Sequence, residues 1–287
     1  ESISKRFGRT IALDGVSLRV ASGEVVGFLG PNGSGKTTTM RSVMGLIAVD
    51  SGAVYWNGEP VDAGRLRRFG STLAERGMYP KMAVRDQLVY FARLAGRSLP
   101  DSIEAADRWI ERMGLTDRAT AEVQSLSSGN QQRVQLAISL VHDPDLLILD
   151  EPFSGLDPVA VETMKDLLLE QARRGVAVLF SSHQLDLVAD ICRQVVIVDR
   201  GRVVLDGDID LLRQRSPLRR VEAQYAHDVE RPSVPAGWVV DRADGRTISL
   251  SVPAGTDLEH IVARLSAHGE IVDFSFGPPE LSEVFVQ

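Results

Sequence analysis

The sequence has a single cysteine, Cys192, among its 287 residues. One thiol cannot form an internal disulfide, which favours a reducing, cytoplasmic setting and predicts that Cys192 is a core residue rather than a nucleophile. Long apolar runs are also missing. The runs 146–149 and 176–180 have the length of strands and fall short of the roughly 18–20 residues that cross a bilayer. We therefore expect neither a disulfide framework nor a membrane-spanning segment.

A basic excess is absent as well, since the formal net charge is −7. Binding to a phosphate backbone needs an excess of Lys and Arg, so nucleic acid is excluded as the main partner. The shares of 44% hydrophobic and 25% charged residues are those of ordinary globular proteins. Because 287 residues are too many for one small domain, we expect a large domain and a smaller one.

The first two thirds of the chain alternate short β-rich runs with helical patterns, which is typical of a parallel sheet covered by helices. Residues 24–29 predict a strand that enters a glycine-rich turn, and residues 36–44 predict the helix that follows. Between 76 and 143 the pattern is mainly helical and predicts a helical subdomain. The expected fold class over residues 1–213 is α/β with a mixed sheet.

A second, smaller unit is expected after residue 213. Residues 214–220 are polar, carry several arginines and contain Pro217, and they predict a linker. Residues 221–287 then combine strand-like and helix-like patterns. They predict a small α+β accessory domain without a catalytic signature.

Residues 30–37 read Gly-Pro-Asn-Gly-Ser-Gly-Lys-Thr and match the Walker A pattern at every specified position. The glycines of this pattern let backbone N–H groups turn toward phosphate oxygens, and the start of the following helix adds positive potential. Lys36 supplies a charge to the β- and γ-phosphates, and Thr37 offers a hydroxyl to Mg²⁺. An ordinary glycine-rich turn is the alternative, which the flanking strand and helix disfavour. The predicted nucleotide-binding residues are Gly30, Pro31, Asn32, Gly33, Ser34, Gly35, Lys36, Thr37 and Thr38.

Two adjacent acids, Asp150 and Glu151, follow the apolar strand predicted at 146–149. This run is typical of a Walker B motif, in which Asp150 holds Mg²⁺. A carboxylate directly after it can orient or deprotonate a water, which predicts that Glu151 is the catalytic base. Taken alone, an acidic pair after a strand is more often a solvated strand end, but the upstream Walker A motif favours the functional interpretation.

A third polar cluster, Ser181, Ser182 and His183, follows the strand predicted at 176–180. Ligands of open α/β sheets bind beyond the carboxyl ends of the strands. We therefore expect the glycine-rich turn, the two acids and His183 to converge on one site. A lone histidine after a strand is more often incidental, and its place in this cluster favours a role in the site.

Residues 126–133 read Leu-Ser-Ser-Gly-Asn-Gln-Gln-Arg and precede an amphipathic helix, for which Ser127 or Ser128 can serve as N-cap. This stretch resembles the signature motif of ABC ATPases, usually written LSGGQ, and lies between the Walker A and Walker B motifs as in that family. Ser128 and Asn130 depart from the motif. The resemblance covers about residues 3–210. It implies a P-loop NTPase fold, ATP and Mg²⁺ as cofactors, and ATP hydrolysis.

The resemblance also implies roles for single residues. Phe7 resembles the aromatic side chain that stacks on adenine, and His183 resembles the switch histidine that contacts the γ-phosphate. Residues 154–157 resemble the D-loop, which crosses the interface between two copies. Where the family has a glutamine, this chain has Ala74 followed by Glu75, and Glu75 is the expected substitute as a ligand to Mg²⁺. The residues expected to reach the nucleotide of a second copy are Ser127, Ser128, Gly129 and Asp157.

As a whole, the resemblance implies the ATP-hydrolysing subunit of an ABC membrane transporter, with Glu151, His183 and Lys36 as catalytic residues. Two copies would pair head to tail at the cytoplasmic face of the membrane and drive a separate integral membrane permease. The stretch 76–85 is the expected docking surface for that permease. The accessory domain resembles the one in sodium- and drug-export-type members and favours export. A soluble ABC ATPase with a regulatory C-terminal domain is the alternative.

Overall fold

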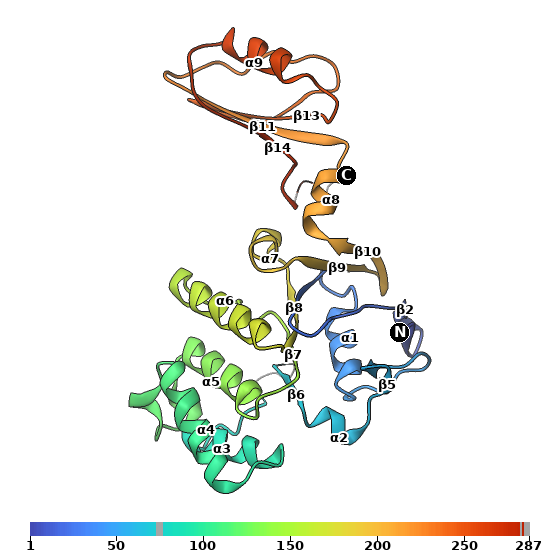
Figure 1. The fold of residues 1–287 in the computed structure, drawn as a ribbon, viewed down its shortest axis with the longest axis vertical. Coiled ribbons are helices and arrows are strands. Elements are labelled where there is room, and N and C mark those ends of the chain that lie inside the picture. Colours follow the sequence, from blue (N-terminus) through green and yellow to red (C-terminus); the bar gives the residue numbers. More distant parts are fainter. Residues whose placement is uncertain (73–76, 282, 284–287) are drawn as a thin grey trace. The chain divides into compact units, whose positions relative to one another are not determined.

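The computed structural model describes residues 1–72, 77–281 and 283. Its chain divides into two compact units, Glu1–Asp206 and Gly207–Gln287 (Figure 1). The division falls inside a strand, β10, and comes before the boundary that the sequence predicted after residue 213. Within the described part of the chain, no helix has the length and apolar character that crossing a membrane requires.

The first unit is built on a six-stranded sheet in the order β10-β9-β3-β8-β7-β6. The neighbours from β9 to β6 run parallel. Two residues connect β9 to β10, which makes this pair antiparallel because parallel neighbours need a longer crossover. The sheet is therefore mixed, as predicted. Its strands are β3 (Val25–Leu29), β6 (Phe69–Ser71), β7 (Leu146–Leu149), β8 (Ala177–Ser182), β9 (Gln194–Asp199) and β10 (Arg202–Asp208).

Shorter antiparallel pairs and the helices complete this unit. The helical group α3, α4 and α5 forms one side of it, and α3 packs against both of the others (Figure 1). The remaining strands are β1 (Ile3–Phe7) paired with β2 (Thr10–Val16), and β4 (Tyr55–Trp56) paired with β5 (Glu59–Pro60). The helices are α1 (Lys36–Val43), α2 (Ala63–Leu66), α3 (Val84–Leu94), α4 (Leu99–Arg112), α5 (Ser128–Leu140), α6 (Pro158–Arg173) and α7 (Leu185–Ile191).

Helix α4 shows how the sequence builds the helical group. The Ser98 side chain accepts a hydrogen bond from the Asp101 backbone N–H and caps the start of the helix. Ala105, Trp109 and neighbouring apolar residues recur on one face, and that face is buried. Because Trp109 is almost fully buried, its truncation to Ala is expected to cost about 3–5 kcal/mol of stability.

The register of the sheet brings three loops together. Leu29 at the end of β3 pairs with Ser182 at the end of β8, and Leu149 at the end of β7 pairs with Phe180. The carboxyl ends of these parallel strands therefore lie at one edge of the sheet. Apolar residues on β3, β7 and β8 pack into the core beneath this edge, which fixes the strands rigidly.

The second unit is a four-stranded antiparallel sheet in the order β12-β13-β11-β14. Its core joins Val221, Leu250 and other apolar sheet residues to Ile261 and Leu265 of α9. This is the α+β arrangement that the sequence predicted. The elements are α8 (Ile209–Arg215), β11 (Leu218–Tyr225), β12 (Val239–Asp244), β13 (Thr247–Pro253), α9 (Leu258–Ser266) and β14 (Ile271–Gly277).

The linker predicted at 214–220 is wrong. α8 ends at Arg215 and β11 begins at Leu218, which leaves two residues between the elements. Two arginines of this stretch are paired within the unit: Arg219 donates to backbone carbonyl groups, and Arg220 lies within 3.4 Å of carboxylate oxygens of Glu222, Glu280 and Glu283. These pairs let a polar sequence form a strand in the interior of the sheet.

Candidate active site

The glycine-rich turn lies between the end of β3 and the start of α1. Gly30 has φ 150° and Gly35 has φ 111°, and both values favour glycine. A Cβ atom added at Gly30 would lie 2.1 Å from the Val198 carbonyl oxygen, and one at Gly35 would lie 2.8 Å from that of Ala12. The two glycines therefore let the turn pass close to neighbouring backbone, and the first N–H groups of α1 remain open to an anion.

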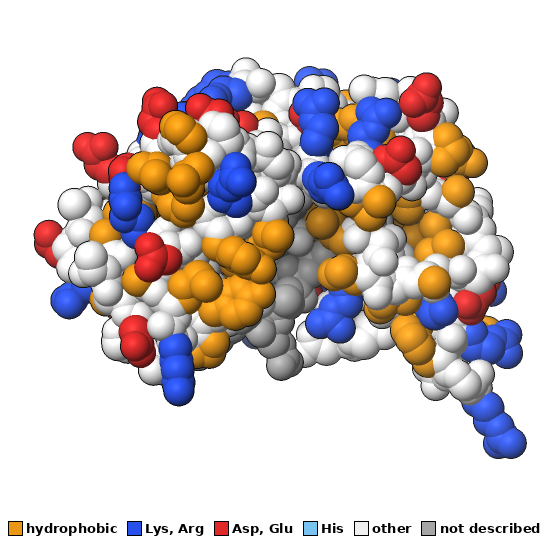
Figure 2. All heavy atoms as spheres, turned by 90° about the horizontal axis from the view of Figure 1, so that it is seen from below, with side chains coloured by type: hydrophobic (Ala, Val, Ile, Leu, Met, Phe, Trp, Pro, Cys, Tyr) orange, Lys and Arg blue, Asp and Glu red, His pale blue; other side chains and the backbone are white. Residues whose placement is uncertain are grey.

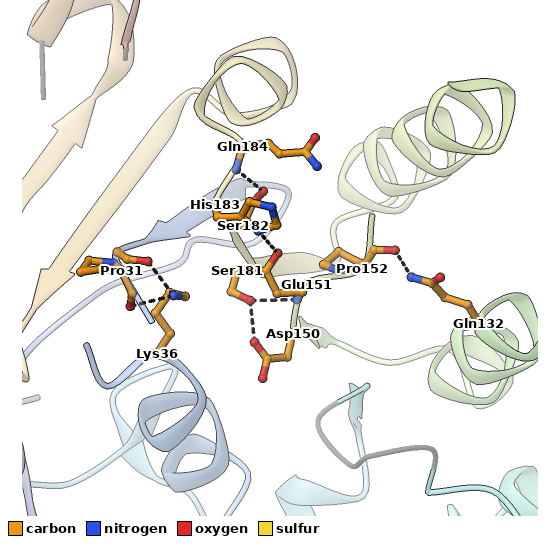
Figure 3. Close-up of polar contacts among 11 residues, drawn as sticks. Pro31, Lys36, Gln132, Asp150, Glu151, Pro152, Ser181, Ser182, His183 and Gln184 are labelled. Atoms are coloured by element: carbon orange, nitrogen blue, oxygen red, sulfur yellow. Dashed lines mark hydrogen bonds and ion pairs between the residues drawn. The ribbon is translucent and has the colours of Figure 1, made fainter. Parts of the chain in front are cut away.

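Lys36 is buried at the base of this turn, with its side chain directed back along the loop (Figure 3). Its ammonium group donates hydrogen bonds to the carbonyl oxygens of Gly30 at 2.6 Å and Pro31 at 3.2 Å. The buried hydroxyl of Ser34, by contrast, has no hydrogen-bond partner among the described residues. A cation beside an unpartnered buried donor and an open helix start fits a phosphate group.

Asp150 directly follows β7, and both of its carboxylate oxygens accept hydrogen bonds. Thr37 donates its hydroxyl to Oδ2 at 2.8 Å, and Ser181 donates its hydroxyl to Oδ1 at 2.6 Å. Among the residues that the structure describes, no three His, Cys, Asp or Glu side chains gather into a metal site. Thr37 and Asp150 still fit Mg²⁺, because this ion is commonly held by one or two carboxylates with waters and phosphate oxygens as its other ligands.

Glu151 faces His183 across the same edge, and Figure 3 shows the two side chains directed toward each other. The His183 Nδ1 atom lies 2.9 Å from Glu151 Oε2. The Glu151 backbone N–H donates to the Ser181 hydroxyl at 2.8 Å. Glu151 also has φ 50°, a conformation that is uncommon for residues other than glycine. One serine hydroxyl therefore links the two acids.

The signature stretch forms the start of α5. Ser127 is the N-cap residue, and its hydroxyl accepts a hydrogen bond from the Asn130 backbone N–H at 3.4 Å. Ser127 and Ser128 are exposed, so the start of this helix faces solvent in the isolated chain. Asp157 has a similar place in α6, because its carboxylate accepts from the Ala160 backbone N–H at 2.8 Å. Their expected contacts with a second copy remain predictions.

The other expected site residues have mixed outcomes. Phe7 lies at the end of β1, is 49% exposed and has the Lys5 ammonium 5.6 Å from its ring centre, so one aromatic surface is accessible to a ligand. Glu75, the expected substitute for the family glutamine, lies outside the described residues, as does Ala74.

Two contacts of the site were not predicted from the sequence. The sequence placed Ser181 after a strand, whereas β8 continues through Ser182, so that Ser181 is fully buried at the strand end. Gln132 of α5 donates its side-chain amide to the Pro152 carbonyl oxygen (Figure 3). The sequence feature that could have indicated the role of Ser181 is its hydroxyl group at the carboxyl end of a strand. No local pattern indicates Gln132, because its partner is 20 residues away.

A second surface lies on α3 and the residues that precede it. We call Tyr79, Tyr90, Phe91 and Leu94 the aromatic patch. Its three rings are 5.4–6.3 Å apart, and Tyr79, Tyr90 and Leu94 are 37–56% exposed. The buried Gln87 side chain pins Tyr79, since it accepts from the Tyr79 backbone N–H at 2.8 Å and donates to the Tyr79 carbonyl oxygen at 3.3 Å. Figure 2 shows hydrophobic side chains gathered on the face that is seen from below.

A comparison with protein families finds one matching model, described as ABC transporter, over residues 13–154. The uncharacterized ABC transporter ATP-binding protein YhaQ of Bacillus subtilis is 36% identical over 287 residues, which are 100% of this chain and 96% of that protein. The Nod factor export ATP-binding protein I of Paraburkholderia xenovorans is 36% identical over 211 residues, 72% of this chain and 69% of that protein.

The fold has solved counterparts as well. A structure described as the ATP binding subunit of an ABC transporter has a TM-score of 0.70 and 28% sequence identity. The match covers 75% of this chain and 91% of that structure.

Proposed function

Since the chain belongs to the ABC transporter ATP-binding proteins and is an ABC ATPase with the P-loop cassette fold, we propose that it hydrolyses MgATP to drive a separate permease in export. The resemblance of the chain to that family is confirmed. The observation that most supports the catalytic part is the convergence of three segments: Thr37 bonds Asp150 at 2.8 Å, and Glu151 meets His183 at 2.9 Å.

In the proposed mechanism the turn at residues 30–38 wraps the triphosphate, and Lys36 exchanges its carbonyl partners for phosphate oxygens. Thr37 and Asp150 hold Mg²⁺, which when bound neutralises charge on the phosphates. Glu151 accepts a proton from the water that attacks the γ-phosphate while the bond from that phosphate to ADP breaks. His183 lies 2.9 Å from the Glu151 carboxylate and would contact the γ-phosphate, as the family resemblance implies. Most of the catalysis is positioning and charge stabilisation.

We propose further that two copies pair head to tail. The exposed start of α5 at Ser127, Ser128 and Gly129 would then face the γ-phosphate bound by the other copy, and Asp157 would lie at the interface. An open helix start attracts anions through its free N–H groups and its dipole. ATP would shift the equilibrium toward the closed pair, because its contacts with both copies exist there alone. Phe7 would stack on the adenine ring.

The aromatic patch is the proposed docking surface for the permease. It overlaps the predicted stretch 76–85 at Tyr79 and extends along α3 through Tyr90, Phe91 and Leu94. An exposed cluster of aromatic and aliphatic side chains marks an interaction site in a protein of this kind. Docking to a permease would hold this chain at the cytoplasmic face of the membrane. The Paraburkholderia relative is named as a Nod factor export protein, which supports the outward direction.

The base assignment is tested with Glu151→Gln, which keeps the shape of the side chain and removes its basicity. We expect ATP binding to remain and hydrolysis to fall by at least about 100-fold, the lower range of a general base's contribution. ATP-bound pairs should then accumulate, which size-exclusion chromatography with MgATP would detect. Glu162→Gln, the same change on an exposed α6 residue, is the control. Normal turnover in Glu151→Gln would remove Glu151 from the proposed role.

A further inference from the structure

The backbone at the proposed base is strained. Glu151 has φ 50°, and the next residue is Pro152. Residues other than glycine rarely adopt positive φ, and a residue before proline is restricted to extended conformations by the proline ring. Such a conformation persists where the surrounding structure determines it, and it is often found at active sites. The contacts that hold Glu151 are therefore part of how the site is built.

Contacts on both sides hold this dipeptide. Before it, the Glu151 N–H donates to the Ser181 hydroxyl at 2.8 Å. After it, the Pro152 carbonyl oxygen accepts from the Gln132 side chain. The proline ring fixes φ of Pro152. With the peptide groups before and after it held, the backbone position of Glu151 is fixed, and its carboxylate can move away from His183 through its side-chain torsions alone.

The turn that follows is also fixed from the sheet side. Ser154 donates its backbone N–H to the Glu151 carbonyl oxygen at 3.1 Å, and the buried Phe153 packs edge-on against Phe180 of β8. Ser181, Phe180 and the turn itself all belong to the sheet and its loops. Gln132 differs from them because it belongs to α5, the helix that begins at the signature Ser127.

We propose that Gln132 is a positioning residue for ATP hydrolysis: its amide holds the Pro152 carbonyl group and so keeps the Glu151 carboxylate at His183. This inference rests on the proposed function, in which Glu151 is the base. It makes the geometry of the base depend on the place of α5, so that the signature helix acts on the site of its own chain as well as on that of a second copy. Gln132 itself need not touch the nucleotide.

The contact has room to open. Gln132, Pro152 and Asp150 line a cavity of about 40 Å³ together with Thr72 and Met164. Among the described residues, the Gln132 amide therefore borders a space that accepts a small polar group or a water. We expect the amide to move into this space when α5 shifts and the contact with Pro152 opens.

The test compares Gln132→Met with Gln132→Lys in the whole chain. Methionine keeps the length of the side chain and its helix propensity but removes the donor, and lysine keeps a donor. We expect Gln132→Met to lower kcat about three- to tenfold, which is the effect of losing one hydrogen bond. The KM for ATP and the Kd for ADP should stay within about twofold of the original values. Lysine should regain part of the loss. Gln124→Ala, which removes an amide that donates to the exposed Glu122, is the control and should retain kcat.

Three outcomes would overturn the inference: an unchanged kcat in Gln132→Met, a kcat in Gln132→Lys as low as in Gln132→Met, or a loss of kcat matched by equal losses of nucleotide affinity and thermal stability. Glu151→Gln is measured beside them. If Glu151→Gln hydrolyses ATP at the normal rate, the assignment of Glu151 as the base is wrong. If Glu151→Gln is inactive while Gln132→Met hydrolyses ATP normally, only the proposed role of Gln132 is wrong.

Discussion

Ser181→Ala removes the hydroxyl that links the two acids of the site. The hydroxyl is fully buried, donates to Asp150 Oδ1 at 2.6 Å and accepts from the Glu151 N–H at 2.8 Å. A bond to a charged group contributes about 1.5–3 kcal/mol to stability and a neutral one about 0.5–1.5 kcal/mol, so the variant should lose about 2–4.5 kcal/mol. Asp150 keeps the bond from Thr37, and water can reach part of the site, which favours the lower end of this range.

For a unit of this size, a loss of about 2 kcal/mol lowers the Tm by about 4–8 °C. Thermal unfolding followed by circular dichroism measures this loss, and hydrolysis of MgATP measures the second consequence, a lower kcat from a less fixed Glu151. Ser182→Ala is the matched control, because the Ser182 hydroxyl is equally buried but accepts from the Gln184 N–H at 3.0 Å and bonds neither acid. Equal losses of Tm and kcat in the two serine variants would refute the reasoning.

Three further predictions concern other parts of the first unit. Lys36→Ala should abolish the thermal stabilisation by MgATP, and a preserved shift would contradict the phosphate role of Lys36. Burial lowers the pKa of His142 below its ordinary value of 6.5. The contribution of this residue to stability is therefore present above pH 6.5 and is lost as the pH falls through the lowered pKa, so His142→Gln should flatten the decline of Tm below pH 6.5. Tyr90→Asp should prevent co-purification of a polytopic membrane protein from detergent extracts and leave hydrolysis by the isolated chain within about twofold, because an exposed patch residue contributes little to the fold.

The parts of the site that the sequence predicted are those whose residues are neighbours in the chain. The turn at 30–37 and the pair Asp150 and Glu151 each combine a motif with a flanking apolar strand, and the register of β3, β7 and β8 then brings them to one edge. His183 was predicted from its place after a strand. Local sequence carries such features because the strand, its end and the polar residues are neighbours in the chain.

The parts that escaped prediction depend on contacts between distant residues. Ser181 meets Asp150 across 31 positions and Gln132 meets Pro152 across 20, and no periodicity or motif records either pair. The interior strand β11 was missed for a related reason. In the sequence, its arginines indicate a solvated linker. In the structure, Arg220 pairs with Glu280 and Glu283, which come about 60 residues later in the chain and could not be assigned to it from the sequence.

The hydrogen bonds of Lys36 have a consequence for how nucleotide enters. A buried ammonium without acceptors would be costly, and the carbonyl groups of Gly30 and Pro31 reduce that cost. In the proposed mechanism, nucleotide binding would therefore exchange these backbone oxygens for phosphate oxygens as partners of the ammonium group. The net electrostatic gain from that exchange would be smaller than for an ammonium group without acceptors, but the turn would already have the shape that a triphosphate needs.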